Sequence, residues 1–168
     1  YLKQIGLLQM LGQSGSWLPC ERATIRLTDK IFSVMPLASS STGEFFQEML
    51  SVGFILSSLS SSSLVLIDEL GRSTSSEDGL AVTIAISESL LKSEAFTILV
   101  SHFSQELSPI LECFGNVAIW SLQADHRLKT GSISSTSYGI EFIKKMRSFS
   151  HEFIKDIDDI EQKIMTRQ

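Results

Sequence analysis

The sequence predicts an α/β fold built on a mainly parallel sheet. Strand-like and helix-like segments alternate along the 168 residues, which is the order of elements that parallel sheets require. Leu64–Ile67 and Ala95–Val100 are short, continuous apolar runs, typical of strands that are buried on both faces. With 43% hydrophobic residues, the chain can fill the core of a compact domain.

The elements before the first buried strand follow from the spacing of their apolar residues. Residues 2–12 place apolar side chains on one helical face, and residues 23–35 are rich in β-branched residues, which predicts one or two strands. After a Ser-rich loop, helical spacing over residues 45–59 predicts a second helix. The tract Ser57–Ser63 is short and lies between two patterned segments, so a tight helix-to-strand connection is preferred to a low-complexity linker.

The elements after that strand continue the alternation. A polar loop over residues 71–78 precedes a helix whose apolar positions run to residue 91, and a short helix is expected over 105–113. Residues 116–122 are expected to form a further strand, and residues 124–137 a polar excursion. Near the end of the chain, apolar residues repeat at steps of four, four, three and four: Phe149, Phe153, Ile157, Ile160 and Ile164. That amphipathic helix docks either on its own domain or on a partner, and the pattern favours neither.

Charge and cysteine content exclude several classes of protein. The net charge of −5 argues against contacts between this segment and nucleic acid, because phosphate binding needs a basic face. Two cysteines that are far apart indicate neither a disulfide framework nor a zinc site. Every apolar stretch is interrupted by serine or charge before it reaches the ~20 residues that span a bilayer. We therefore expect no membrane partner, and reduced thiols in an intracellular compartment.

Two carboxylates follow the first buried strand directly. Asp68 and Glu69 come after Leu64–Ile67, and ligands bind at this edge of open α/β sheets. Asp68 is suited to hold Mg²⁺ beside phosphate oxygens, and Glu69 to orient or deprotonate an attacking water. His102 ends the second buried strand, so it can approach the same site and sense a terminal phosphate. The alternatives are a turn with solvated acids and a loop histidine.

The order of these motifs resembles the ABC-type ATPase domain of MutS proteins, and so implies a P-loop NTPase fragment. Residues 64–79 (LVLIDELGRSTSSEDG) resemble that family's Walker B strand and D-loop, and residues 95–107 (AFTILVSHFSQEL) its switch-histidine strand. Residues 1–4 (YLKQ) resemble the start of the helix after the Walker A loop, and SGSWLP and FQEM follow in the family's order. The start of the chain and residues 95–97 are most similar to the eukaryotic meiotic branch, the fourth MutS homologue.

The resemblance implies a role for each candidate residue. Asp68 would be the Mg²⁺ carboxylate of an ATP site, Glu69 the hydrolytic base and His102 the γ-phosphate switch. His126 falls where the family often places a ring near adenine, although a solvated loop histidine is the alternative. The family's usual Ser-Thr pair is replaced by Gly43-Glu44, and its usual Gly by Ser73. That Ser normally completes the neighbouring subunit's ATP site, which puts hydrolysis there in doubt unless Ser41 and Thr42 take its place.

The resemblance also implies how the chain is divided and what it binds. Residues 1–135 would be an ABC-type ATPase domain that lacks the Walker A loop, so we expect this segment alone to bind ATP weakly and not to hydrolyse it. Residues 136–168 would be a helix-turn-helix dimerisation element that packs against a second MutS-homologue subunit, as a heterodimer. DNA would be bound by domains outside this segment, and the protein would act in the nucleus.

Two other functions are consistent with parts of the sequence. An ABC-type ATPase of a transporter or a chromosome-maintenance protein would have a Leu-Ser-Gly-Gly type signature before the Walker B strand, and the tract Ser57–Ser63 does not resemble one. A degenerate module that pairs subunits and leaves catalysis to its partner is favoured by Gly43 and Ser73. The presence of Asp68, Glu69 and His102 argues against it.

Overall fold

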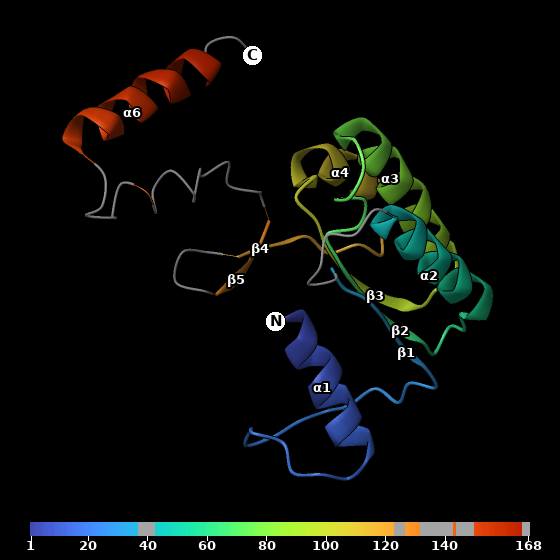
Figure 1. Cartoon of the computed structure of the whole chain (residues 1–168). Helices are drawn as coiled ribbons and strands as arrows, with labels where there is room; N and C mark the ends of the chain where they lie inside the picture. The colour runs from blue at the N-terminus through green and yellow to red at the C-terminus, as the bar shows by residue number, and fades with distance from the viewer. Residues whose placement is uncertain (37–42, 123–126, 132–142, 144–149, 166–168) are drawn as a thin grey trace. The chain divides into compact units, whose positions relative to one another are not determined.

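The computed structural model describes residues 1–36, 43–122, 127–131, 143 and 150–165 (Figure 1). The chain divides into two compact units, residues 1–117 and 118–168. The sequence places a domain boundary after residue 135 instead. Because residues 132–142 lie outside the described part, that boundary stays a prediction.

The first unit is built on a three-stranded parallel sheet in the order β1-β2-β3. The strands are β1 (Ile31–Val34), β2 (Leu64–Asp68) and β3 (Phe96–Val100). The central strand β2 is paired on both edges, and its residues 64–67 are buried. The alternation of strands and helices thus predicts the parallel sheet correctly.

The expectation that Ala95–Val100 is a strand buried on both faces is wrong in one respect. The segment is a strand, but Phe96 is 53% and Val100 44% exposed. In the described part of this unit β3 pairs with β2 alone, which leaves its other edge open. An apolar run therefore predicted the strand and not its burial.

Helices cover both faces of this sheet because successive side chains of β2 point in opposite directions. Val65 and Ile67 pack with Val52 of α2 (Glu44–Ser58) and Leu90 of α3 (Ser76–Lys92). Leu64 and Leu66 pack instead against α1 (Leu2–Gln13). Figure 1 shows α1 apart from α2, α3 and the short helix α4 (Ser104–Leu111). The helices follow the expected segments within a few residues.

The serine tract before β2 is a tight connection, as expected. α2 ends at Ser58 and β2 begins at Leu64. The carboxylate of Asp29 accepts hydrogen bonds from the hydroxyls of Ser60 and Ser63, at 2.6 and 3.3 Å. The bond from Ser60 is the main cause that lowers the pKa of Asp29. These bonds fix the loop beside the start of the central strand.

Only the end of the segment expected to form one or two strands over residues 23–35 is a strand. β1 starts at Ile31, and the preceding backbone is bonded by side chains of α1 instead of by a neighbouring strand. Gln9 donates its Nε2 to the carbonyl of Arg26 at 2.6 Å, and Gln13 donates to the carbonyl of Thr28 at 3.1 Å. These amides satisfy backbone groups of the segment, which joins the sheet only from Ile31 onward.

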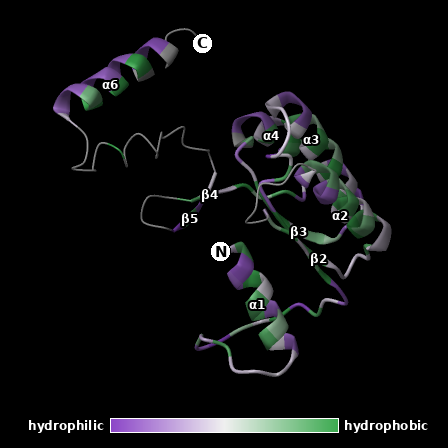
Figure 2. Cartoon of the chain, in the orientation of Figure 1, coloured by the Kyte–Doolittle hydropathy of each residue, from purple (hydrophilic) through white to green (hydrophobic). Residues whose placement is uncertain are grey.

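The second unit contains a hairpin and a helix. β4 (Trp120–Leu122) pairs antiparallel with β5 (Leu128–Thr130). The strand expected over 116–122 is therefore shorter and not part of the parallel sheet, and the expected polar excursion over 124–137 contains β5. α6 (His151–Met165) follows the predicted amphipathic pattern, and Figure 2 shows apolar and polar residues alternating along it.

The helix-turn-helix ending stays a prediction. The segments 132–142 and 144–149, including Phe149, lie outside the described residues. Phe153 and Ile160 on the apolar face of α6 are 45% and 55% exposed. Within the part of the chain that the structure describes, no helix is both long enough and apolar enough to cross a membrane.

Candidate functional site

The candidate site lies at the carboxyl ends of β2 and β3. Asp68 is the last residue of β2 and is paired in register with Val100, the last residue of β3. The backbone N–H of Glu69 donates to the carbonyl of Val100 at 2.9 Å. The chain therefore leaves both strands at the same edge of the sheet. Residues 68–69 and His102 follow directly from these two neighbouring strand ends. This parallel pairing is as expected from the sequence, whereas the roles of the three residues stay predictions.

Glu69 begins a tight turn in an unusual backbone conformation. Its φ of 51° lies in the left-handed region, which costs a non-glycine residue about 1 kcal/mol or more. Its carboxylate pairs with the guanidinium of Arg72 at 2.7 Å. The Arg72 side chain is 68% exposed, so this ion pair contributes little to stability. The conformation of Glu69 must therefore be fixed by the rest of the turn.

Contacts from α3 hold the inner side of this turn. The Leu70 side chain is fully buried, and its carbonyl accepts a hydrogen bond from the hydroxyl of Thr83 at 3.1 Å. Gly71 has a φ of 77°, and a Cβ atom at this position would lie 2.7 Å from the Cα of Gly79. Glycine is thus required at position 71 both by the backbone conformation and by the close approach of α3.

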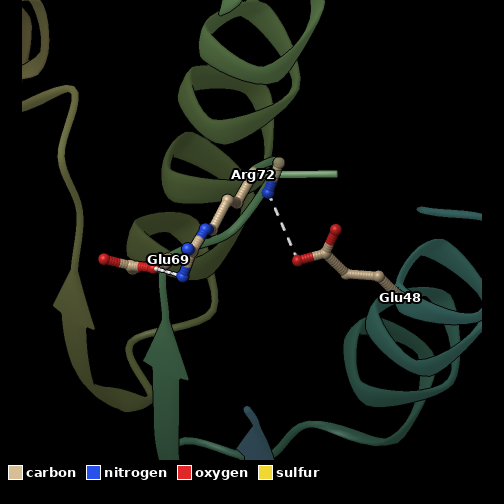
Figure 3. Close-up of polar contacts among 4 residues, drawn as sticks. Glu48, Glu69 and Arg72 are labelled. Atoms are coloured by element: carbon tan, nitrogen blue, oxygen red, sulfur yellow. Dashed lines mark hydrogen bonds and ion pairs between the residues drawn. The ribbon is translucent and has the colours of Figure 1, made fainter. Parts of the chain in front are cut away.

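Glu48, which belongs to the FQEM motif but has no role predicted from the sequence, holds the outer side of the turn. It lies on α2 and accepts hydrogen bonds from the backbone N–H of Gly71 at 3.2 Å and the hydroxyl of Ser73 at 3.4 Å. Figure 3 shows its carboxylate directed from α2 toward this turn, with Arg72 turned to Glu69. Burial raises the pKa of Glu48 above its usual value, and the two hydrogen bonds oppose that rise.

A signal for Glu48 was present in the sequence. It lies one helical turn before Val52, which is buried, and beside Met49, which packs on the core. Glu48 is therefore a carboxylate on the inward side of an amphipathic helix, where a charge has to find partners. Periodicity alone did not reveal that those partners lie beyond β2.

An open groove of about 590 Å³ runs along this side of the site. It is lined by the end of β1, by one face of α2 and by the turn after β2, and its charged residues are Glu44, Glu48, Glu69 and Arg72. Of the three residues expected to act together, Glu69 lines the groove, and Asp68 and His102 do not. The groove is thus bounded by the turn and α2, and the end of β3 lies outside it.

His102 is held differently from Glu69. Its ring is exposed and contacts that of Phe103, with ring centroids 3.9 Å apart and the ring planes tilted by 39°. Phe103 is 6% exposed and packs beside Gly79 of α3. Among the described residues, His102 makes no hydrogen bond to Asp68 or Glu69. Its place beside them comes from the strand register alone.

The three candidate nucleotide-binding residues outside the sheet are less well defined. Ser41 and His126 lie outside the described residues. Gly43 precedes α2 with a φ of 111°, and a Cβ atom there would meet nothing within 4 Å. A serine at position 43 would be strained by the backbone and not by its neighbours. The replacement of the usual Ser by Gly43 therefore matches the local conformation.

The acids present suit a magnesium ion that arrives with a phosphate ligand. In the described part of the chain no group of three or more His, Cys, Asp and Glu side chains could hold a metal by itself. Mg²⁺ is usually bound by one or two carboxylates together with water and substrate phosphates. Asp68, half-buried at the end of β2, fits that arrangement.

A parallel sheet with adjacent carboxylates at the end of its central strand defines a class of α/β domain that binds ligands at this edge. Comparison with protein families then makes the assignment specific. The family model described as MutS domain V matches residues 1–165. The chain belongs to this family.

Individual relatives agree with the assignment. The chain is 37% identical over 155 residues to a DNA mismatch repair protein MutS of Prochlorococcus marinus, in a match that covers 84% of the chain. It is 32% identical to the MutS protein homolog 4 of Mus musculus over 100% of the chain, and 34% identical to the DNA mismatch repair protein MSH4 of Arabidopsis thaliana over 83%. It spans only 17%, 19% and 19% of the length of these three relatives.

Proposed function

We propose that the chain is the ATPase segment of a MutS-like protein that acts in meiotic recombination or mismatch repair. In this proposal ATP hydrolysis controls DNA binding and subunit pairing. The matches to the MutS protein homolog 4 of mouse and to the MSH4 protein of Arabidopsis thaliana support the recombination branch and, with it, action in the nucleus.

The observation that supports hydrolysis most strongly is the fixed turn at the end of β2. Asp68 would hold Mg²⁺ together with phosphate oxygens of ATP, and the ion would neutralise charge on the reacting phosphate. Glu69, held in a left-handed conformation at the edge of the groove, would orient or deprotonate the attacking water. His102 would contact the γ-phosphate. Ser41, Gly43 and His126 would contribute to nucleotide contacts, the first two at a partner's site.

The proposed partner is a second MutS-homologue subunit, in a heterodimer. Phe153 and Ile160 present a half-exposed apolar face on α6, which such a subunit would cover. DNA would be bound by parts of the protein outside this segment, in keeping with its net charge of −5.

A second candidate function is a degenerate module that pairs subunits and leaves ATP hydrolysis to its partner. It is favoured by the two departures from the family's pattern, Gly43-Glu44 and Ser73. Hydrolysis by the full-length heterodimer, with one subunit mutated at a time, separates the two candidates. Loss of hydrolysis only when the partner is mutated would support the pairing module.

The test of the proposed function is Glu69→Gln in the full-length protein with its partner. The amide keeps the shape of the side chain and cannot accept a proton, so turnover should fall by about 100-fold or more while ATP binding is kept. Glu88→Gln is the control, because it removes a half-buried carboxylate of α3 that has no hydrogen bond to the turn. Equal turnover in wild type and Glu69→Gln would refute the role of Glu69.

A further inference from the structure

We infer that Glu48 is a positioning residue for hydrolysis: by bonding Gly71 and Ser73 from α2, it fixes the turn that places Glu69. This inference rests on the proposed function, because it assumes that Glu69 activates water. Glu48 would not touch the substrate itself. It would act through the backbone of the turn.

The geometry assigns Glu48 a place that no other described side chain fills. The turn is fixed on the β3 side by the bond from Glu69 to Val100, and on the α3 side by the bond from Thr83 to Leu70. Its third side faces the groove and α2, and there the two oxygens of Glu48 take one hydrogen bond each. Without them, the N–H of Gly71 and the hydroxyl of Ser73 would depend on water.

The hydrogen bond between Glu48 and Gly71 affects Glu69 because Gly71 and Glu69 are close in the chain. Gly71 is two residues after Glu69, and the φ angles of both are positive. A left-handed non-glycine residue relaxes when its surroundings loosen. Loss of the bond to Gly71 would therefore let Glu69 leave its conformation, and a shift of about 1 Å in a catalytic group can lower a rate by about 100-fold.

The role of Glu48 depends on its acceptor oxygens and not on its charge. Burial raises its pKa, so the folded protein disfavours the ionised form. A glutamine at this position would keep one oxygen acceptor for the N–H of Gly71 without a charge.

The same contact ties the start of α2 to the site. Glu48 lies one turn after Gly43 and Glu44, where α2 begins. A displacement of this end of α2 would be passed to the turn through the bonds of Glu48, and so to Glu69. The two hydrogen bonds of Glu48 would therefore make hydrolysis sensitive to whatever contacts the first turn of α2.

The experiment compares Glu48→Ala, Glu48→Gln, Glu69→Gln and the control Glu88→Gln in the full-length protein with its partner subunit. The kcat and KM for ATP, the Mg²⁺ dependence and the melting temperature are measured for each. Glu48→Ala should lower kcat by about 10-fold to 100-fold. Glu48→Gln keeps one carbonyl acceptor for Gly71, so it should recover most of the loss and remain within about fivefold of wild type. KM and the Mg²⁺ dependence should stay unchanged, and Glu48→Gln should melt no lower than wild type.

The possible outcomes separate a positioning role of Glu48 from a metal-binding role, from a purely structural role and from failure of the proposed function. If Glu69→Gln loses activity and Glu48→Ala keeps wild-type kcat, the positioning role is refuted and the proposed function stands. If Glu48→Ala regains its activity at high Mg²⁺ concentration, Glu48 is a metal ligand and the inference is wrong. If kcat and melting temperature fall together in Glu48→Gln, the residue is merely structural. If Glu69→Gln itself is fully active, the proposed function has failed first.

Discussion

The ends of β2 and β3 lie side by side and are held in opposite ways. The turn after β2 is fixed around the buried Leu70 by hydrogen bonds that it donates to α2 and β3 and accepts from α3. The segment after β3 follows a strand that pairs on one edge only among the described residues of this unit, and His102 is exposed and contacts Phe103. One edge of a sheet thus presents a carboxylate on a fixed turn beside an exposed histidine. The proposed roles of Glu69 as a base and of His102 as a phosphate contact depend on that difference.

The largest stability difference between the two regions should come from their apolar side chains. Leu70→Ala empties a fully buried position after β2 and should cost about 3 kcal/mol in the free energy of unfolding. Val100→Ala on β3, where 44% of the residue is exposed, should cost below about 1 kcal/mol. Urea unfolding of the two variants measures both values. Equal losses would mean that β3 is as firmly packed as the turn.

A smaller difference is expected between two glycines with similar backbone angles. Gly71→Ala meets the strain of a φ of 77° and a Cβ contact of 2.7 Å with Gly79, and should cost about 2 to 3 kcal/mol. Gly15→Ala has a φ of 74° with nothing within 4 Å, and should cost about 1 kcal/mol. The same unfolding assay measures both. If Gly71→Ala costs no more than Gly15→Ala, the turn is looser than its contacts with α3 indicate.

The smallest expected effect is a pH dependence of the free energy of unfolding that comes from Glu48 beside the turn. The pKa of Glu48 is raised, mainly by burial and also by the charge of Glu44. Hydrogen bonds from Gly71 and Ser73 oppose this rise. The folded state therefore favours the protonated carboxyl, so its contribution is present at low pH and lost as pH rises through the raised pKa. The stability of Glu48→Gln relative to wild type should increase as pH rises above the usual value of 4.5. A difference that stays constant from pH 4 to pH 7 would contradict the burial of this carboxylate.

The regular elements of the first unit could be predicted because each one follows from a local pattern. The apolar run of β2, the helical spacing of α2 and α3, and the meeting of residues 68–69 with the end of β3 all depend on periodicity and strand order. The boundaries of β1 could not be predicted in this way. Gln9 and Gln13 donate hydrogen bonds to backbone carbonyls that a neighbouring strand would otherwise pair. The periodicity of apolar residues does not predict such contacts.

The same reason explains what was missed at the site. The carboxylates of Asp68 and Glu69 stand out in the sequence because they directly follow an apolar strand. Glu48 is 23 residues from Gly71, and its bonds form only when α2 packs on the sheet. Similarly, the burial of β3 depends on how many neighbours it has, which its own apolar residues do not specify.

Whether the fixed Glu69 activates water is measured by single-turnover ATP hydrolysis in the full-length protein with its proposed partner subunit. With Glu69→Gln, bound ATP should remain uncleaved for about 100 times longer than in wild type. Glu88→Gln should cleave its bound ATP at the wild-type rate. Cleavage by Glu69→Gln as fast as by wild type, with ATP bound equally well, would show that Glu69 is not the base.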